Sequence, residues 1–123
     1  MGLRLLVVED DAGIRSMLDR GLRLAGHEVV LAADLAAGRA AWEPGALDAV
    51  ILDVMLPDGD GIRLLAERRA AGDTTPTVLL TAREAADLQA RATAAGASAR
   101  LVKPFAYAEL LAVLERLRPS TGA

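Results

Sequence analysis

The sequence predicts an α/β domain built on a doubly wound parallel sheet, and three observations support this fold class. Five short runs rich in Val, Leu and Ile alternate with longer segments of helical period. The short runs are apolar throughout, as expected for strands of a parallel sheet, which is buried on both faces. Glycines punctuate the ends of most helical segments. A chain of 123 residues fits one such domain and can bury a core.

The elements follow one another in strict alternation. The expected strands are residues 3–8, 28–31, 49–52, 77–80 and 100–102. After the first strand, Ile14, Met17, Leu18 and Leu22 recur at i, i+3, i+4 and i+8, which predicts an amphipathic helix. Further helices are expected at residues 35–42, 62–71, 85–95 and 107–118. Residues 1–118 therefore form the expected domain, and residues 119–123 have linker composition, as at a domain end within a longer chain.

Composition argues against several classes of function. The chain has no cysteine, which excludes disulfides and thiolate metal sites. The net charge of -3 and an aromatic content of 2% argue against a nucleic-acid surface on this domain. No apolar stretch approaches membrane-spanning length, and no signal segment is seen. We therefore expect a cytoplasmic protein with no membrane partner.

Polar residues follow four of the five apolar runs. Glu9 and Asp10 follow the first run, Asp53 the third, Thr81 the fourth and Lys103 the fifth. In an open parallel sheet the carboxyl ends of the strands meet at one crevice, where ligands bind. Asp53 also opens into a Pro/Gly turn, so we expect it at the centre of a reactive site.

The residue types in this group suit phosphoryl transfer. Three clustered carboxylates repel one another unless a hard cation such as Mg²⁺ lies among them. An ionised aspartate can attack phosphorus, while a lysine and a hydroxyl stabilise the phosphoryl oxygens. Taken singly, the acidic run 9–11 is more simply a solvated loop, Thr81 an N-cap for a helix beginning near Glu84, and Lys103 a surface lysine.

Four motifs resemble the receiver domains of bacterial two-component response regulators over essentially the whole chain. They are Val7-Val8-Glu9-Asp10-Asp11, the run from Leu52 to Gly61, Leu80-Thr81-Ala82 and Val102-Lys103-Pro104-Phe105. The pattern around them is nearest to receivers that precede winged-helix DNA-binding domains. The resemblance implies a flavodoxin-like, five-stranded sheet of order 2-1-3-4-5 with five helices.

The resemblance also implies roles for individual residues. Asp53 accepts a phosphoryl group from the phosphohistidine of a sensor histidine kinase. The side chains of Glu9, Asp10 and Asp53, with the Met55 backbone carbonyl, hold Mg²⁺. Thr81 moves toward the phosphoryl group and Lys103 pairs with it. The Lys103–Pro104 peptide bond is expected to be cis, because an X-Pro bond reduces the cost of cis to about 0.5–1 kcal/mol.

One segment departs from the winged-helix subfamily. Where those receivers read Gly-Ala-Asp-Asp-Tyr, this chain has Gly96-Ala97-Ser98-Ala99-Arg100, and Val113 stands where an arginine is usual. The aromatic switch position is thus Arg100, although a tolerated, solvent-facing substitution is the simpler interpretation. We expect phosphorylation to drive self-association through the fourth helix, fifth strand and fifth helix only weakly.

Other functions fit less well. A Mg²⁺-dependent aspartyl phosphatase needs a second aspartate two residues after the nucleophile, and that place holds Met55. A phosphorylation-independent interaction domain with a vestigial site is less favoured because all five polar residues are present. A dinucleotide-binding domain lacks its glycine-rich signature. We therefore expect a phosphoacceptor signalling domain, not an enzyme, that switches a C-terminal output domain, which we expect to act in transcription.

Overall fold

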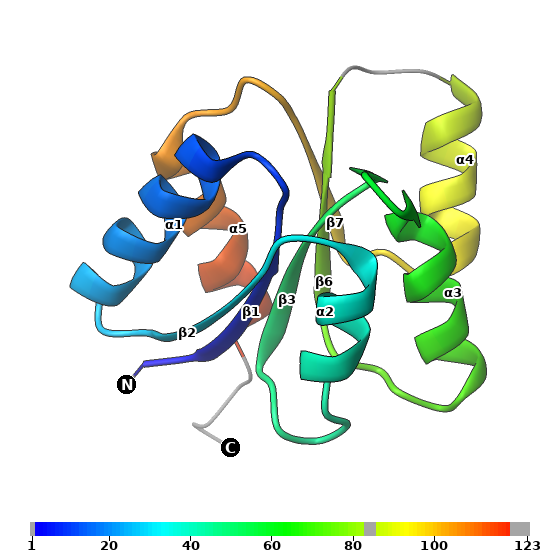
Figure 1. Cartoon of the computed structure of the whole chain (residues 1–123), viewed down its shortest axis with the longest axis horizontal. Coiled ribbons are helices and arrows are strands. Elements are labelled where there is room, and N and C mark those ends of the chain that lie inside the picture. Colours follow the sequence, from blue (N-terminus) through cyan, green and yellow to red (C-terminus); the bar gives the residue numbers. More distant parts are fainter. Residues whose placement is uncertain (1, 83–85, 119–123) are drawn as a thin grey trace.

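A five-stranded parallel sheet forms the centre of the protein in a computed structural model that describes residues 2–82 and 86–118 (Figure 1). Its strands are β1 (Arg4–Val8), β2 (Glu28–Ala32), β3 (Ala49–Asp53), β6 (Thr77–Thr81) and β7 (Ala99–Val102). They lie in the order β2-β1-β3-β6-β7, and every neighbouring pair is parallel. In terms of this sheet's own strands the order is 2-1-3-4-5, which confirms the predicted fold.

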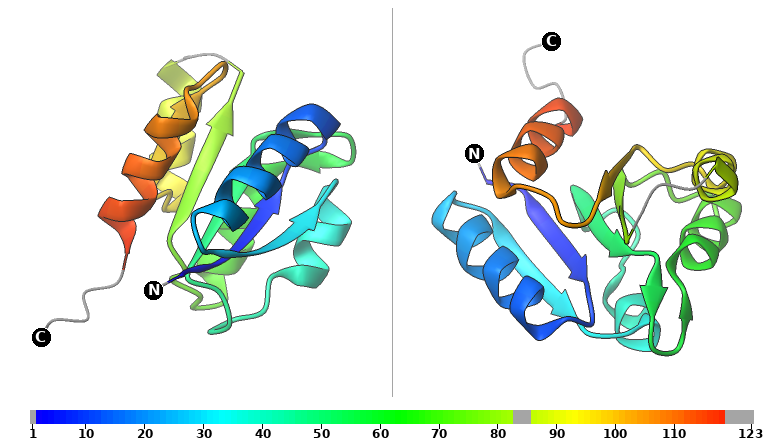
Figure 2. Two further views of the ribbon diagram at one scale, coloured as in Figure 1. Left: turned by 90° about the vertical axis from the view of Figure 1, so that its left-hand side faces the viewer. Right: turned by 90° about the horizontal axis from the view of Figure 1, so that it is seen from above.

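Five helices cover the two faces of the sheet. They are α1 (Ala12–Leu24), α2 (Leu35–Ala41), α3 (Gly61–Ala70), α4 (Ala86–Ala95) and α5 (Tyr107–Leu117). Helices α1 and α5 lie on one face, and α2, α3 and α4 lie on the other (Figures 1 and 2). Each end of these five strands and five helices lies within two residues of the end predicted from the sequence. Among the described helices, none combines the length and apolarity needed to span a membrane.

Side chains alternate between two cores, one on each face of the sheet. Along β1, Leu5 and Val7 pack with α1 and α5, whereas Leu6 and Val8 pack with α2 and α3. All four side chains are fully buried. This explains why these four positions of β1 are all apolar, because neither face of this central strand meets water there. On α1 the predicted stripe is confirmed for Leu18 and Leu22, but Met17 is 41% exposed.

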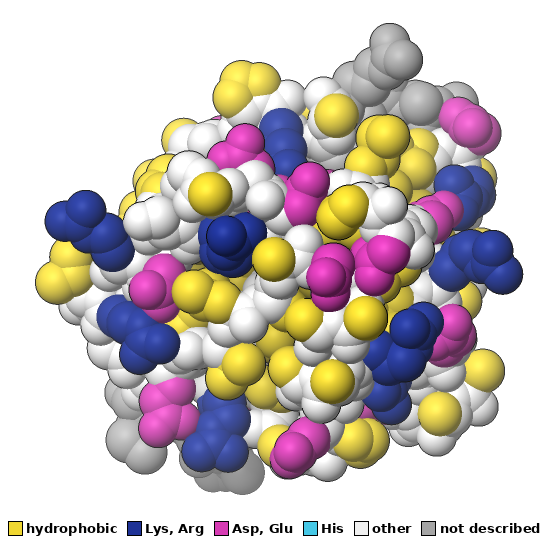
Figure 3. Space-filling view, viewed as in Figure 1, with side chains coloured by type: hydrophobic (Ala, Val, Ile, Leu, Met, Phe, Trp, Pro, Cys, Tyr) yellow, Lys and Arg dark blue, Asp and Glu magenta, His cyan; other side chains and the backbone are white. Residues whose placement is uncertain are grey.

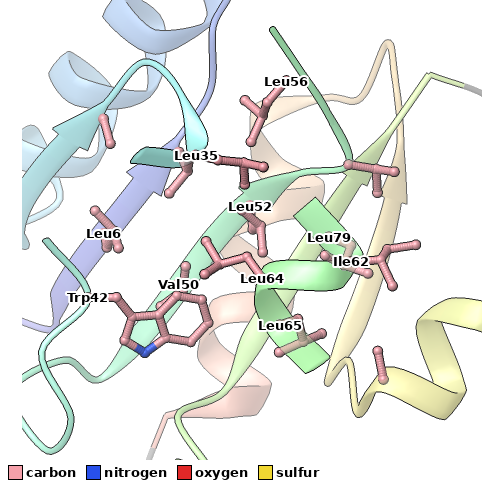
Figure 4. Close-up of a cluster of buried hydrophobic side chains, with 14 of the residues drawn as sticks. Leu6, Leu35, Trp42, Val50, Leu52, Leu56, Ile62, Leu64, Leu65 and Leu79 are labelled. Carbon is pink, nitrogen blue, oxygen red and sulfur yellow. The ribbon is translucent and has the colours of Figure 1, made fainter. Parts of the chain in front are cut away.

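Trp42 anchors the core on the α2 side. Its side chain is buried in the same cluster as Val50 and Leu64 (Figure 4). The indole N–H donates to Asp73 Oδ2 at 3.0 Å. Asp73 is itself buried and accepts at Oδ1 from the backbone N–H and the hydroxyl of Thr75. The ring therefore packs in the core without leaving its one polar atom unsatisfied.

The turn after Asp53 contains a small hairpin that the sequence did not predict. Strands β4 (Met55–Leu56) and β5 (Gly59–Asp60) pair antiparallel around Pro57 and Asp58. Each strand has only two residues, which is too short to show a period of alternating polarity. The hairpin begins at Met55, two residues after Asp53, and ends at the start of α3.

His27 is buried, although it lies in the turn between α1 and β2. Its Nδ1 accepts a hydrogen bond from the Leu3 N–H at 2.9 Å. Burial lowers the pKa of the imidazole, and the positive charge of Arg118 lowers it further, while Glu115 opposes the change. The folded protein therefore favours the neutral ring.

This lowered pKa predicts a loss of stability in acid. The contribution is fully present above the pKa of His27 in the unfolded chain, near 6.5, and is lost as the pH falls through that value toward the lowered folded pKa. A tenfold difference in proton affinity between the folded and unfolded chain corresponds to about 1.4 kcal/mol. We expect urea unfolding at pH 7.5 and pH 5 to show a larger acid loss for the wild type than for His27→Asn, which keeps an acceptor but does not titrate. Equal losses would contradict the prediction.

Candidate functional site

Glu9 and Asp10 follow β1 at the carboxyl edge of the sheet. Glu9 is 0% exposed, and its Oε2 accepts from the Asp11 N–H at 3.0 Å, whereas Asp10 is exposed. The Arg15 guanidinium donates to the backbone carbonyls of Glu9 and Asp10 at 2.9 and 3.2 Å. The loop is thus fixed from α1 with one carboxylate directed inward and its neighbour toward solvent.

Asp53 is the last residue of β3 and is 4% exposed. Its Oδ1 accepts from the Met55 N–H at 3.2 Å. The backbone passes close beneath it, because the Gly61 N–H donates to the Val54 carbonyl at 2.7 Å. A Cβ at Gly61 would lie 2.1 Å from the Asp53 carbonyl oxygen, so only glycine fits there. Asp53 is therefore held in a compact turn.

Lys103 joins the two buried carboxylates. Its Nζ lies 2.9 Å from Asp53 Oδ2 and 2.7 Å from Glu9 Oε1. The Lys103 N–H donates to the Thr81 carbonyl at 2.6 Å, which extends the pairing of β6 and β7 by one step. The Lys103–Pro104 peptide bond is cis, the isomer expected for this turn. Lys103 is also the only lysine in the chain. This is a second sequence signal that points to the residue, besides its position at the end of a strand.

The charges at this site change one another's pKa values. Burial raises the pKa of Glu9 and the nearby Asp53 carboxylate adds to the rise, while Lys103 and the Asp11 N–H act against it. Burial acts to lower the pKa of the Lys103 ammonium, but the Glu9 and Asp53 carboxylates outweigh this and raise it. Lys103 is therefore positively charged at neutral pH, and it offsets only part of the surrounding negative charge.

The acidic group has the composition of a site for a hard divalent cation. Glu9, Asp10 and Asp53 each offer a carboxylate oxygen, and these oxygens all lie within 4.8 Å of one another. Oxygen-only ligands with one side open to water are what Mg²⁺ prefers. Figure 3, which has the same view as Figure 1, shows several acidic side chains in the upper half of the molecule. The carboxyl ends of the strands lie in that half in Figure 1. The donor set fits a cation of this class.

Thr81 brings a buried hydroxyl to the same edge. It is the last residue of β6, is 0% exposed, and its Oγ1 has no hydrogen-bond partner among the described residues. A buried hydroxyl left unpaired costs roughly 1–3 kcal/mol. The N-cap interpretation of Thr81 concerns a helix start near residues 83–85, which lie outside the described residues; the described helix begins at Ala86. A buried hydroxyl that has no protein partner is free to donate a hydrogen bond to an oxygen of a bound ligand.

Arg100 and Met55 are the two remaining residues predicted for the site. Arg100 is partly buried in β7, level with Leu79 of β6, so it is not the fully solvent-facing residue of the simpler interpretation. The Met55 side chain is 72% exposed, and only its backbone faces the Asp53 turn through the N–H bond to Asp53.

Two carboxylates in the hairpin were missed by sequence reasoning. Asp58 accepts hydrogen bonds from the first residues of α2, and Asp60 caps α3 through the Ile62 N–H at 2.8 Å and forms an ion pair with Arg91 of α4. Aspartate just before a helix is an N-cap signal, which could have identified Asp60. Asp58 caps a helix that is distant in sequence, so no local pattern marks it.

Comparison with known proteins agrees with this geometry. The sequence profile of the response regulator receiver domain matches residues 5–115. The Response regulator MprA of Mycolicibacterium vanbaalenii is 42% identical over 130 aligned residues, which cover 100% of this chain and 55% of that protein. The Transcriptional regulatory protein PrrA of Mycobacterium tuberculosis is 38% identical, with 98% and 52% covered. The chain thus spans about half the length of these curated relatives.

Solved structures show the same architecture. The non-phosphorylated HemR receiver domain of Leptospira biflexa superposes with a TM-score of 0.88 at 34% identity, covering 95% of this chain and 98% of that one. The chemotaxis protein CheY4 of Vibrio cholerae superposes with a TM-score of 0.87 at 32% identity, covering 95% and 99%.

Proposed function

The chain belongs to the response regulator receiver domain family, and we propose that its Asp53 accepts a phosphoryl group from the phosphohistidine of a sensor kinase. One observation carries this proposal. The buried Asp53 carboxylate lies 2.9 Å from the Lys103 ammonium and within 4.8 Å of oxygens of Glu9 and Asp10. A nucleophilic carboxylate, a fixed cation and a metal-binding acidic pair are the parts that phosphoryl transfer to an aspartate requires.

The proposed step moves the phosphoryl group from nitrogen to oxygen. An Asp53 carboxylate oxygen attacks phosphorus, an oxygen–phosphorus bond forms, and the phosphorus–nitrogen bond to the donor histidine breaks. The electron pair of that bond stays on the imidazole nitrogen, which takes up a proton. Lys103 stabilises the charge on a phosphoryl oxygen, and the unpaired Thr81 hydroxyl donates to another.

We further propose Mg²⁺ as the cation of the site. The side chains of Glu9, Asp10 and Asp53 and the backbone carbonyl of Met55 would hold it. When bound, a divalent ion neutralises negative charge on the transferring phosphoryl group. The carboxylates need such compensation, because Lys103 alone leaves net negative charge in a buried cluster.

The residues do not equip the domain for turnover on external substrates. The position two residues after Asp53 is Met55, whose side chain carries no acid or base. The domain in this proposal assists only its own phosphorylation and dephosphorylation. A vestigial site is disfavoured, since the structure brings Glu9, Asp53 and Lys103 into contact and Thr81 lies at the same edge.

The experiment is uptake of phosphate from a small acyl-phosphate donor, followed by intact-mass spectrometry. We expect one phosphoryl group per chain with Mg²⁺ present and none with excess EDTA. Uptake that is equally fast in EDTA would exclude the proposed cation site. No uptake under any condition would favour the phosphorylation-independent interaction domain.

The output of the switch is also a proposal. MprA is named a response regulator and PrrA a transcriptional regulatory protein, and this chain covers only about half of each. We propose that the domain controls a C-terminal DNA-binding module, with residues 119–123 as the start of the linker. The sensor kinase and the DNA-binding output module, the two proposed partners of the domain, would be met in the cytoplasm.

Self-association on phosphorylation is expected to be weak through the face formed by α4, β7 and α5. Ser98 replaces an acid of the subfamily, and its hydroxyl accepts from the Thr77 N–H at 3.0 Å. Val113 is 5% exposed and packs in the core, so it offers nothing to a partner. Exposed charge pairs are each worth about 0–1 kcal/mol, and losing several leaves little to hold a dimer.

Sedimentation with and without a beryllofluoride phosphoryl mimic measures this association. We expect a monomer in both states at micromolar concentration, and expect Arg100→Tyr to increase association. A tight dimer that forms with the mimic and is lost on mutation of Arg100 or Ala99 would contradict the prediction.

A further inference from the structure

The β4–β5 hairpin after Asp53 is tied to α2 by a carboxylate. Asp58 Oδ1 accepts from the Leu35 N–H at 2.7 Å, and its Oδ2 accepts from the Ala36 N–H at 3.0 Å. The Leu35 N–H also lowers the pKa of Asp58, so the group is fully ionised at neutral pH. Both oxygens of one side chain thus bind the start of a helix more than twenty residues away in sequence.

This contact differs in kind from an ordinary N-cap. The first N–H groups of a helix have no partner within the helix. In α2 the carboxylate of the local cap Asp34 accepts only from the Ala37 N–H, at 2.8 Å. The Asp58 carboxylate accepts from the two N–H groups before it, those of Leu35 and Ala36. The two aspartates therefore divide the capping of one helix, one from within its own segment and the other from the hairpin.

Apolar contacts on one side and an ion pair on the other also hold the hairpin. Leu35 and Leu56 are buried in the same cluster, and a Cβ at Gly59 would lie 2.8 Å from Leu35 Cδ1. On the other side, Asp60 pairs with Arg91 of α4. The hairpin is thereby clamped between α2 and α4.

The clamp has a consequence for the metal site. Met55 begins the hairpin, and its own side chain is largely exposed, so packing of that side chain does not fix its backbone. The Met55 backbone is held instead by the hydrogen bond from its N–H to Asp53 Oδ1 and by the anchors of the hairpin on α2 and α4. We propose that Asp58 is a positioning residue for the Mg²⁺ site, which acts by fixing the Met55 carbonyl through α2. This inference rests on the proposed function.

The experiment measures Mg²⁺ binding by isothermal calorimetry, and urea unfolding without metal, for the wild type, Asp58→Ala and Asp34→Ala. Asp34→Ala is the matched control, because it uncaps the same helix without touching the hairpin. We expect Asp58→Ala to weaken Mg²⁺ binding about tenfold, the lower end of what loss of an outer-shell partner costs. Asp34→Ala is expected to lower stability but to bind Mg²⁺ within about twofold of the wild type. Asp58→Asn keeps one acceptor, so its Mg²⁺ affinity should lie between those of the wild type and Asp58→Ala.

The outcomes separate the two claims. Wild-type protein that binds no Mg²⁺ would overturn the proposed function itself. Wild-type binding with unchanged affinity in Asp58→Ala would overturn only the positioning role. Equal weakening in both alanine variants would show that helix stability, not hairpin position, controls the site, and would also overturn it. If Asp58→Ala does not fold, affinity in folded Asp58→Asn decides, and wild-type affinity there contradicts the proposal.

Discussion

Asp53→Asn is expected to abolish phosphoryl uptake. The amide has the size of the carboxylate and can still accept from the Met55 N–H, so the turn is expected to keep its shape. It lacks the anionic oxygen that attacks phosphorus, and no acyl phosphate can form. Lys103 keeps its ion pair with Glu9. Intact-mass spectrometry after incubation with acetyl phosphate and Mg²⁺ should show no added phosphoryl group.

Asp48→Asn provides the matched control. Asp48 directly precedes β3, so it lies at the opposite end of the strand that Asp53 ends. Its carboxylate accepts only from the Arg4 N–H among the hydrogen bonds of the described residues. This variant should be phosphorylated like the wild type. Persistent uptake by Asp53→Asn would show that another residue is the acceptor.

Lys103→Met is expected to lower the free energy of unfolding strongly in metal-free protein. The thioether keeps the apolar stem but removes the charge that pairs with Glu9 and Asp53. Removing one partner of a buried ion pair typically costs about 3–5 kcal/mol, because the other charge stays buried. Urea unfolding at pH 7 in EDTA measures this loss.

The loss should depend on charge and not on packing. Lys103→Arg keeps a cation and should retain most of the stability, although its planar guanidinium cannot reproduce the ammonium contacts. Addition of Mg²⁺ should recover part of the loss in Lys103→Met, since a cation among the carboxylates replaces some of the missing charge. Equal stability of the wild type and Lys103→Met in EDTA would mean that the ion pair contributes nothing.

Much of the fold could be predicted, because strands that are buried on both faces of a sheet are apolar at successive positions. The run 49–52 is apolar at every position, and β3 is buried at every position. The order of the strands could not be predicted in this way, because periodicity does not specify which strands are neighbours. Only the family resemblance supplied it. The β4–β5 hairpin could not be detected from any pattern because its strands have two residues each.

The site was predictable to the extent that it depends on strand ends. Parallel strands bring their carboxyl ends together, so Glu9, Asp53 and Lys103 meet although they are far apart in sequence. Contacts set by packing were not predictable. The hydrogen bond from α2 to Asp58 and the burial of Val113 depend on where helices settle against the sheet, which no local pattern states.

Fragmentation mass spectrometry of the phosphorylated wild type tests the central claim most directly. Protein treated with acetyl phosphate and Mg²⁺ is reduced with borohydride to trap the acyl phosphate, digested and sequenced. We predict that the modified residue is Asp53 alone, with Glu9, Asp10 and the other carboxylates unchanged. Modification at any other residue, with Asp53 intact, would contradict the assignment of Asp53 as the phosphoacceptor.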